Sequence, residues 1–234
     1  MADKPYDTEL HAGGEAAWDM SDDGIAYIKA HVGAGSTTLE TGAGATSLMF
    51  LEQGADHHAV TPSETERDLI TAEAERRGLD ASKLTFHLGY SQDVLPRLDL
   101  GAPLDFVLID GGHGFPIPAV DWLYTAPMLK VGGIMMVDDV DLWTGAMLVD
   151  FMDAEACWTK RDVLRGRTAV FELTSPFELH EWTKQPHVVA KSRWPQRMRK
   201  ARNVAGLVAK GEFATIRSKM AHEKRLAEAA KDDY

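Results

Sequence analysis

A glycine-rich turn and one carboxylate form the first group of residues that could do chemistry. The turn is Gly42-Ala43-Gly44, and Glu40 stands two residues before it. Such a turn lets a ligand approach the backbone N–H groups at a helix N-terminus. The carboxylate of Glu40 suits a ligand with a positive amine and would repel a pyrophosphate. We therefore expect an amino-acid-bearing nucleoside here, although two glycines alone would also fit a buried turn.

A dinucleotide fits this turn less well. A dinucleotide-binding fingerprint would have a third glycine where Ser47 stands. It would also have an acidic residue after the next strand, where this chain has Thr61, and Glu64 lies slightly late. A nicotinamide-dependent dehydrogenase is therefore the weakest of the enzyme classes considered.

The second group is acidic. Asp110 ends one apolar segment, and Asp138 and Asp139 end the next. Three carboxylates at adjacent strand ends would repel one another, and a hard divalent cation such as Mg²⁺ would neutralise them with oxygen ligands. The alternative is that Asp138 and Asp139 cap a helix or hydrogen-bond their loop. His113 could act as a general base, ligate a metal or hold its loop by a hydrogen bond.

The segments that must position these residues alternate between short apolar and longer amphipathic stretches. The expected strands are 37–41, 57–61, 84–88, 104–109 and 134–137, followed by a hairpin of 158–164 and 168–173. The expected helices are 22–32, 46–53, 64–78, 91–96, 117–130 and 143–153, with one or two amphipathic helices from about 196 onward. This order predicts an α/β fold with a Rossmann-like, doubly wound, mostly parallel sheet and an antiparallel terminal hairpin. Ligands bind such sheets at the carboxyl ends of the strands, where both groups lie.

Charge divides the chain into an acidic body and a basic tail. Residues 1–175 hold 29 acidic and 12 basic residues, whereas residues 176–234 hold 7 acidic and 13 basic ones. We expect an N-terminal helical cap (1–35), a central α/β domain (36–175) and a basic helical C-terminal extension (176–234). We expect the basic helix to pack on the acidic body, whose charge it complements, or to form a homodimer arm. Contact with a membrane or an anionic glycan is the alternative, and no specific nucleic acid is expected.

Composition excludes several other classes. The single cysteine, Cys157, excludes an intrachain disulfide framework and a cysteine-based zinc site. Residues 1–11 show neither the positive nor the apolar region of a signal peptide. No stretch reaches the ~18 apolar residues of a membrane span. We therefore expect a cytoplasmic protein.

Four motifs in this order resemble class I S-adenosylmethionine-dependent methyltransferases. They are Glu40–Ser47, Gly89–Ser91 with Leu95-Pro96, Leu108–His113, and Gly132-Gly133 before Val137–Asp139. The most similar subgroup is the small bacterial enzymes with an IDGGH motif, which are relatives of the metal-dependent O-methyltransferases. The resemblance covers about residues 36–173 and identifies 36–175 as the methyltransferase domain.

The resemblance implies transfer of a methyl group from S-adenosylmethionine to a hydroxyl of a small molecule, sugar-like or natural-product-like, with a divalent cation such as Mg²⁺. It implies that Glu40 meets the methionine ammonium, that Gly42 and Gly44 line methionine and ribose, and that Ser91 lies along the adenine. The full set of implied cofactor contacts is Glu40, Gly42, Gly44, Thr46, Ser47, Thr61, Glu64, Ser91 and Asp110. The implied metal ligands are Asp110, Asp138 and Asp139, and the implied catalytic residues are His113 and Asp110.

One departure from the family pattern keeps other functions open. The acidic residue that usually holds the ribose hydroxyls is replaced by Thr61, and Glu64 is the candidate substitute. One alternative is therefore a non-catalytic binding module with a methyltransferase fold. Another is a metal-independent methyltransferase with His113 as its base or with a nitrogen acceptor.

Overall fold

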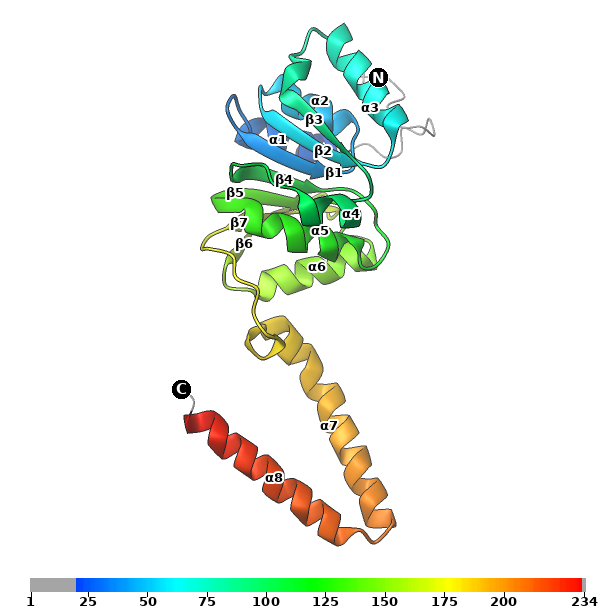
Figure 1. Ribbon diagram of the computed structural model, residues 1–234, viewed down its shortest axis with the longest axis vertical. Helices are drawn as coiled ribbons and strands as arrows, with labels where there is room; N and C mark the ends of the chain where they lie inside the picture. The colour runs from blue at the N-terminus through cyan, green and yellow to red at the C-terminus, as the bar shows by residue number, and fades with distance from the viewer. Residues whose placement is uncertain (1–19, 233–234) are drawn as a thin grey trace. The chain divides into compact units, whose positions relative to one another are not determined.

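The computed structural model describes residues 20–232, drawn in Figure 1. The chain forms two compact units, Met1–Leu179 and His180–Tyr234. The strands are β1 (Thr37–Thr41), β2 (Asp56–Thr61), β3 (Leu84–Leu88), β4 (Leu104–Ile109), β5 (Leu129–Val137), β6 (Trp158–Leu164) and β7 (Thr168–Leu173). The α-helices of the first unit are α1 (Asp22–His31), α2 (Ala45–Glu52), α3 (Glu64–Arg76), α4 (Ser91–Val94), α5 (Ile117–Thr125) and α6 (Trp143–Ala154). Short 3-10 turns are η2 (Ala81–Lys83), η3 (Leu95–Arg97), η4 (Ala126–Met128) and η5 (Trp182–Lys184).

The strands form one mixed sheet in the order β3-β2-β1-β4-β5-β7-β6. The pairs from β3 to β5 are parallel, and β7 runs antiparallel to both β5 and β6. This confirms the predicted doubly wound sheet with an antiparallel terminal hairpin. The strand order reverses between β1 and β4, and their carboxyl ends form the switch point at which ligands bind in such sheets.

Alternating side chains of the central strands supply two cores. On β4, Val107 and Ile109 pack with α5 and α6, whereas Phe106 and Leu108 pack with α1 and α2. All four side chains are buried. Burial on both faces explains the continuous apolar run at 104–109. Figure 1 shows the helices α5 and α6 covering one face of the sheet.

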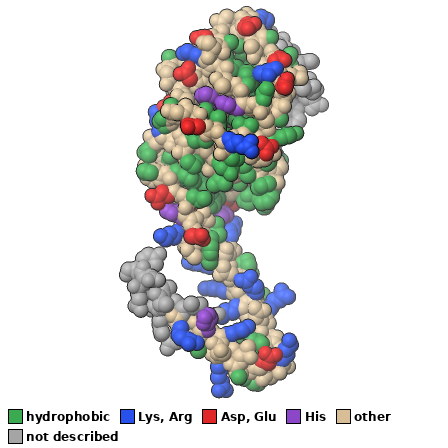
Figure 2. Space-filling view, viewed as in Figure 1, with side chains coloured by type: hydrophobic (Ala, Val, Ile, Leu, Met, Phe, Trp, Pro, Cys, Tyr) green, Lys and Arg blue, Asp and Glu red, His purple; other side chains and the backbone are tan. Residues whose placement is uncertain are grey.

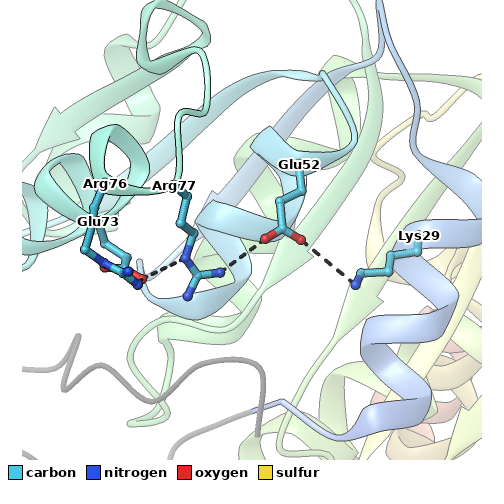
Figure 3. Close-up of polar contacts among 5 residues, drawn as sticks. All are labelled: Lys29, Glu52, Glu73, Arg76 and Arg77. Carbon is cyan, nitrogen blue, oxygen red and sulfur yellow. Dashed lines mark hydrogen bonds and ion pairs between the residues drawn. The ribbon is translucent and has the colours of Figure 1, made fainter. Parts of the chain in front are cut away.

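Ion pairs tie three helices together on the other face, as Figure 3 shows. Lys29 of α1 lies 4.0 Å from Glu52 of α2, and Arg77 reaches the same carboxylate at 3.1 Å. Arg77 and Arg76 both pair with the buried Glu73 of α3, at 2.7 and 2.6 Å. These contacts lower the pKa of Glu73 from its ordinary value of 4.5 to about 2, the hydrogen bond from Arg76 acting against the effect of burial.

Two helices make up most of the second unit. Helix α7 spans Pro186–Ala209 and α8 spans Phe213–Asp232, with Gly211 between them at a φ of +71°. The expected start of helix near residue 196 is ten residues late, because Pro186 occupies the first helical turn, where its missing N–H costs nothing. Pro195 lies inside α7. Figure 2 shows Lys and Arg side chains gathered along this unit.

Two further boundaries differ from the expectations. Helix α5 ends at Thr125, and β5 begins at Leu129 instead of residue 134, because Pro127 falls in the short turn η4 between them. The boundary between the compact units follows Leu179, close to the expected 175/176. Most of the expected N-terminal cap, residues 1–19, lies outside the described residues. Within the described residues, no helix is long and apolar enough to cross a membrane.

Candidate active site

A cavity of about 610 Å³ opens at the carboxyl ends of β1, β2 and β4. Its walls come from the turn after β1, the loop after β2, the start of α4 and the loop after β4. The site is therefore the switch point of the sheet. A volume of this size is typical of a small-molecule or cofactor pocket.

Gly42 brings the two sides of this cavity together. Its φ of +91° is one that L side chains rarely adopt, and its N–H donates to the carbonyl of Val60 at 2.9 Å. A Cβ on Gly42 would lie 2.4 Å from the backbone oxygen of Asp110. The turn after β1 can therefore touch the end of β4 only with glycine at this position.

Glu40 lies at the base of the cavity and is 1% exposed. The hydroxyl of Thr46 donates to Oε2 at 2.5 Å, and the hydroxyl of Ser47 donates to Oε1. Nε2 of the buried His57 lies 3.2 Å from Oε1. Ser47 also accepts a hydrogen bond from the N–H of Gly44, so helix α2 begins on the Glu40 carboxylate. A buried carboxylate needs such partners to be tolerated.

The loop after β2 presents Glu66 to the cavity. The hydroxyl of Thr61 donates to Oε2 of Glu66 at 2.9 Å, and both residues line the cavity. Ser63 is the N-cap of α3 and accepts from the N–H of Glu66, which places Glu66 in the first turn. Glu64 lies outside the lining, with its side chain 75% exposed and 3.7 Å from Arg67. Glu66, and not Glu64, is therefore the glutamate of this turn that lines the cavity.

Ser91 begins α4 and lines the cavity together with Tyr90. The fully buried Asp121 of α5 lies behind it. Burial raises the pKa of Asp121, and the nearby hydroxyls of Ser91 and Thr41 act in the opposite direction. Among the described residues, neither carboxylate oxygen of Asp121 has a partner within hydrogen-bond geometry.

Two of the predicted acids have raised pKa values. Burial raises the pKa of Asp110 well above its ordinary value, and the charges of Asp138, Glu40 and Asp139 add to the effect. Burial also raises the pKa of Asp138, although the hydroxyl of Thr168 donates to Oδ1 of this residue. Asp110 lines the cavity, whereas Asp138 is turned toward Thr168 and is 7% exposed.

Asp139 is the centre of the charged side of the cavity. Nε2 of His113 lies 3.1 Å from Oδ2, and Nε and Nη2 of Arg167 lie 2.7 and 2.6 Å from Oδ1. Asp139 has a φ of +52°, a left-handed conformation that Asp tolerates better than most residues. Gly145 of α6 allows this turn, because a Cβ there would lie 2.7 Å from the carbonyl oxygen of Asp139. The hydroxyl of Thr144 donates to the carbonyl of His113 at 2.7 Å and holds the histidine loop against α6.

A metal ion fits this arrangement poorly. Among the described residues, Asp110, His113 and Asp139 are the group whose ligand atoms lie within 4.8 Å of one another. However, Oδ1 of Asp139 already accepts a hydrogen bond from the guanidinium of Arg167, and Oδ2 faces His113. A divalent cation on Asp139 would lie beside a positive charge. The predicted third ligand, Asp138, is bonded to Thr168 instead.

The structure therefore brings most of the predicted site residues to one cavity. The predicted residues that line it are Glu40, Gly42, Gly44, Thr46, Thr61, Ser91, Asp110, His113 and Asp139. Ser47, Glu64 and Asp138 do not line it. Glu66 and Arg167 line it and were missed. Glu66 is the last residue of the capping box Ser63–Glu66. Arg167 directly precedes the last strand, so the register of the predicted hairpin was the signal that could have identified this arginine.

Comparisons with known proteins agree with this fold. Residues 39–140, less than half of the chain, match a family model described as a methyltransferase domain. No curated protein matches the chain. The segment 39–140 runs from the middle of β1 to just past Asp139 and includes most of the residues that line the cavity.

Three solved structures have a similar fold. Cofactor-bound Rv0187 from MTB is 17% identical, with a TM-score of 0.55 over 66% of this chain and 81% of that one. The O-methyltransferase TomG from Streptomyces achromogenes, in complex with SAM, is 16% identical, with a TM-score of 0.56 over 68% and 82%. An O-methyltransferase from Bacillus cereus, in complex with SAH, is 16% identical, with a TM-score of 0.58 over 74% and 94%. The family model thus matches a methyltransferase domain over residues 39–140, and the solved structures show the same fold. The IDGGH subgroup stays a prediction.

Proposed function

We propose that this methyltransferase domain transfers the methyl group of S-adenosylmethionine to a hydroxyl oxygen of a small molecule. The observation that carries the proposal is the cavity at the switch point, which has two chemically different sides. The side at the carboxyl ends of β1 and β2 offers carboxylates and hydroxyls. The side at the carboxyl ends of β4 and β5 offers a histidine paired with an aspartate. When bound, the cofactor supplies a methyl group on a sulfonium, which is ready for in-line displacement.

The first side fits the amino-acid and ribose parts of the cofactor. Glu40 supplies negative charge for the methionine ammonium, directly or through water, and its oxygens retain accepting capacity beside Thr46 and Ser47. Gly42 lets the turn after β1 close against the backbone of Asp110, which shapes this part of the cavity. Glu66 and Thr61 are a carboxylate and a hydroxyl 2.9 Å apart, which suits two neighbouring ribose hydroxyls. We assign to Glu66 the part that the sequence suggested for Glu64.

The second side fits an acceptor hydroxyl. His113 is a candidate general base, and Asp139 orients its ring through the 3.1 Å contact at Nε2. The remaining ring nitrogen, Nδ1, is then the atom that would take the hydroxyl proton. Asp110 lines the same cavity and has a raised pKa, so its carboxyl retains a proton more readily and can hydrogen-bond the acceptor oxygen.

Two exposed aromatic rings stand near this second side. Phe115, two residues after His113, and Trp143, at the start of α6, have ring centroids 6.0 Å apart and are 65% and 68% exposed. Phe115 belongs to the loop that carries His113, and Trp143 begins the helix that follows the Asp139 loop. Exposed aromatic side chains next to a polar site favour an acceptor with an apolar or aromatic face.

A pair of glutamates tests the cofactor side. Glu66→Gln should weaken S-adenosylhomocysteine binding about tenfold, since a charge-assisted hydrogen bond is worth ~1.5 kcal/mol or more. Glu64→Gln is the matched control, because this residue begins the same helix and lies outside the cavity lining. Equal affinities of both variants, measured by calorimetry, would contradict the assignment to Glu66.

Turnover tests the reaction itself. We expect transfer of labelled methyl from S-adenosylmethionine to at least one member of a panel of phenols, sugars and other hydroxylated small molecules. His113→Gln should lower the rate about 100-fold without changing cofactor affinity, as removal of a general base does. Transfer only to amines would favour a nitrogen acceptor. Cofactor binding without transfer to any acceptor would favour a non-catalytic module.

A further inference from the structure

We propose that Arg167 takes the place of a divalent cation in this site, so that the His113–Asp139 pair is charge-balanced and oriented without bound metal. The inference rests on the proposed function for its meaning, because it concerns the side assigned to the acceptor hydroxyl. Its central test is a metal-binding experiment that needs no turnover. The inference about Arg167 and the proposed methyl transfer can therefore fail separately.

The topology of the sheet puts this arginine where a cation would be needed. Strand β7 runs antiparallel to β5, and Ala169 pairs with Val137. The residues just before β7 therefore lie beside those just after β5, and the N–H of Val140 donates to the carbonyl of Arg167 at 2.8 Å. Two successive β7-side residues meet two successive acids: Thr168 bonds Asp138, and Arg167 bonds Asp139.

The contact between Arg167 and Asp139 has a defined geometry. Both Nε and Nη2 of Arg167 lie within 2.7 Å of Oδ1, a geometry that a point charge such as lysine cannot reproduce. Burial opposes the charge on Arg167, but the carboxylates of Asp139 and Asp138 outweigh it and raise the pKa of the guanidinium. The contact leaves Oδ2 of Asp139 directed at His113.

One fixed positive charge changes what the acidic cluster needs. Asp110, Asp138 and Asp139 would repel one another without a counter-charge, and a cation was predicted on that ground. The charge of Arg167 acts on all three acids, since it also opposes the raised pKa of Asp110 and Asp138. A divalent cation among Asp110, His113 and Asp139 would have to bind against this charge or displace it.

The test is manganese binding to the full chain, measured by electron paramagnetic resonance of free Mn²⁺. Wild type should show no binding up to about 1 mM Mn²⁺. Arg167→Gln should bind Mn²⁺ at least about tenfold more tightly than wild type, because it removes the repelling charge and frees Oδ1 of Asp139. Adding Asp139→Asn to Arg167→Gln should abolish that gain.

Two controls separate charge from structure. Arg161→Gln removes another arginine that pairs with a single carboxylate, that of Glu172, and Arg161 does not line the cavity. It should bind no Mn²⁺. Arg167→Lys keeps a positive charge and should exclude Mn²⁺ as wild type does. Its turnover should recover part of what Arg167→Gln loses, which a purely structural position would not show.

Three results would overturn the proposal. The first is wild-type protein that binds Mn²⁺ with a submillimolar dissociation constant. The second is a folded Arg167→Gln variant that binds Mn²⁺ no better than wild type. The third is wild-type turnover that EDTA abolishes and Mg²⁺ restores. The first and third use wild type only, so the proposal stays testable if the variant does not fold.

Discussion

Glu40 and Asp139 are two carboxylates of one cavity that are stabilised in different ways. Glu40 is 1% exposed and is held by the hydroxyls of Thr46 and Ser47, with His57 beside it. Asp139 has a side chain that is 13% exposed and is held by Arg167 and His113. Short neutral donors from the next helix suit a carboxylate that is part of the folded framework. A guanidinium and an imidazole from distant loops suit a carboxylate that orients a base.

Burial and charge compensation therefore divide the cavity into a framework side around Glu40 and a reactive side around Asp139. Changes at Glu40 should therefore affect both stability and cofactor affinity. Changes at Asp139 should mainly affect turnover. The backbone contact at Gly42 joins the two sides, and breaking it should affect both.

The largest effect is expected for Gly42→Ala. An added Cβ would lie 2.4 Å from the Asp110 carbonyl oxygen, so the two sides must separate. We expect a loss of about 3 kcal/mol in unfolding free energy and no measurable S-adenosylhomocysteine binding. Gly35→Ala is the matched control, since Gly35 has a φ of +87° and no atom within 4 Å of its added Cβ.

Gly35→Ala should cost only the penalty of the left-handed conformation, about 1 kcal/mol, and leave binding intact. Chemical denaturation and calorimetry measure the two effects. Equal losses in both alanine variants would show that the contact between Gly42 and Asp110 does not matter.

The next effect separates the two carboxylates directly. Asp139→Asn keeps a side chain that tolerates a positive φ but weakens the ion pairs, so turnover should fall about 100-fold. Unfolding free energy should change by about 1 kcal/mol or less, because Arg167 is partly exposed.

Glu40→Gln should behave in the opposite way. Its amide would face the hydroxyl donors of Thr46 and Ser47, and we expect a loss of about 2 kcal/mol together with weaker S-adenosylhomocysteine binding. Denaturation, calorimetry and turnover of both variants measure the contrast. Asp139→Asn would refute it by destabilising the fold as much as Glu40→Gln.

The pH dependence of stability compares Asp110 with Glu73. The folded pKa of Asp110 is raised above 3.8, so above that pH the folded chain keeps a proton that the unfolded chain releases. This contribution lowers the unfolding free energy as pH rises. Asp110→Asn should therefore stabilise the chain by about 1 kcal/mol near pH 8 and leave it unchanged below pH 3.8.

Glu73 has the opposite sign. Its folded pKa is about 2 against an ordinary 4.5, so it contributes stability above pH 4.5 that is lost as pH falls toward 2. Glu73→Gln breaks the ion pairs in Figure 3 and should destabilise the chain at neutral pH. It should also remove the loss of stability that Glu73 causes as pH falls toward 2. Urea unfolding across this pH range measures both variants, and a common sign would contradict the assigned shifts.

The smallest effect concerns the second unit. A chain that ends at Leu179 keeps the whole of the first compact unit, which contains the sheet and the cavity. It should bind S-adenosylhomocysteine with an affinity within about twofold of the full chain, by calorimetry. A larger loss would show that residues 180–234 take part in the cofactor side. A homodimer, a membrane or glycan contact and a cytoplasmic location stay predictions.

The fold could be predicted from sequence because its signals are local. The continuous apolar run 104–109 indicates a strand buried on both faces, and the glycines at 42 and 44 indicate a strand-to-helix turn. The carboxyl ends of parallel strands meet at one edge, so Glu40, Asp110 and His113 could be assigned to one site.

The errors in the site involve side-chain direction and long-range partners. Glu64 and Glu66 are both in the first turn of α3, and only the orientation of that turn decides which one faces the cavity. Arg167 is 28 residues from Asp139 in sequence, and the antiparallel register of β5 and β7 brings it there. A predicted cation site could not account for an arginine that only tertiary structure supplies.

Calorimetric titration of S-adenosylhomocysteine into the full chain in EDTA tests whether the cavity binds the cofactor without a metal ion. We expect one site per chain with a dissociation constant below about 100 µM, unchanged when Mg²⁺ replaces EDTA. Two results would contradict it. One is the absence of binding to folded protein at about 1 mM ligand, and the other is binding that requires added Mg²⁺.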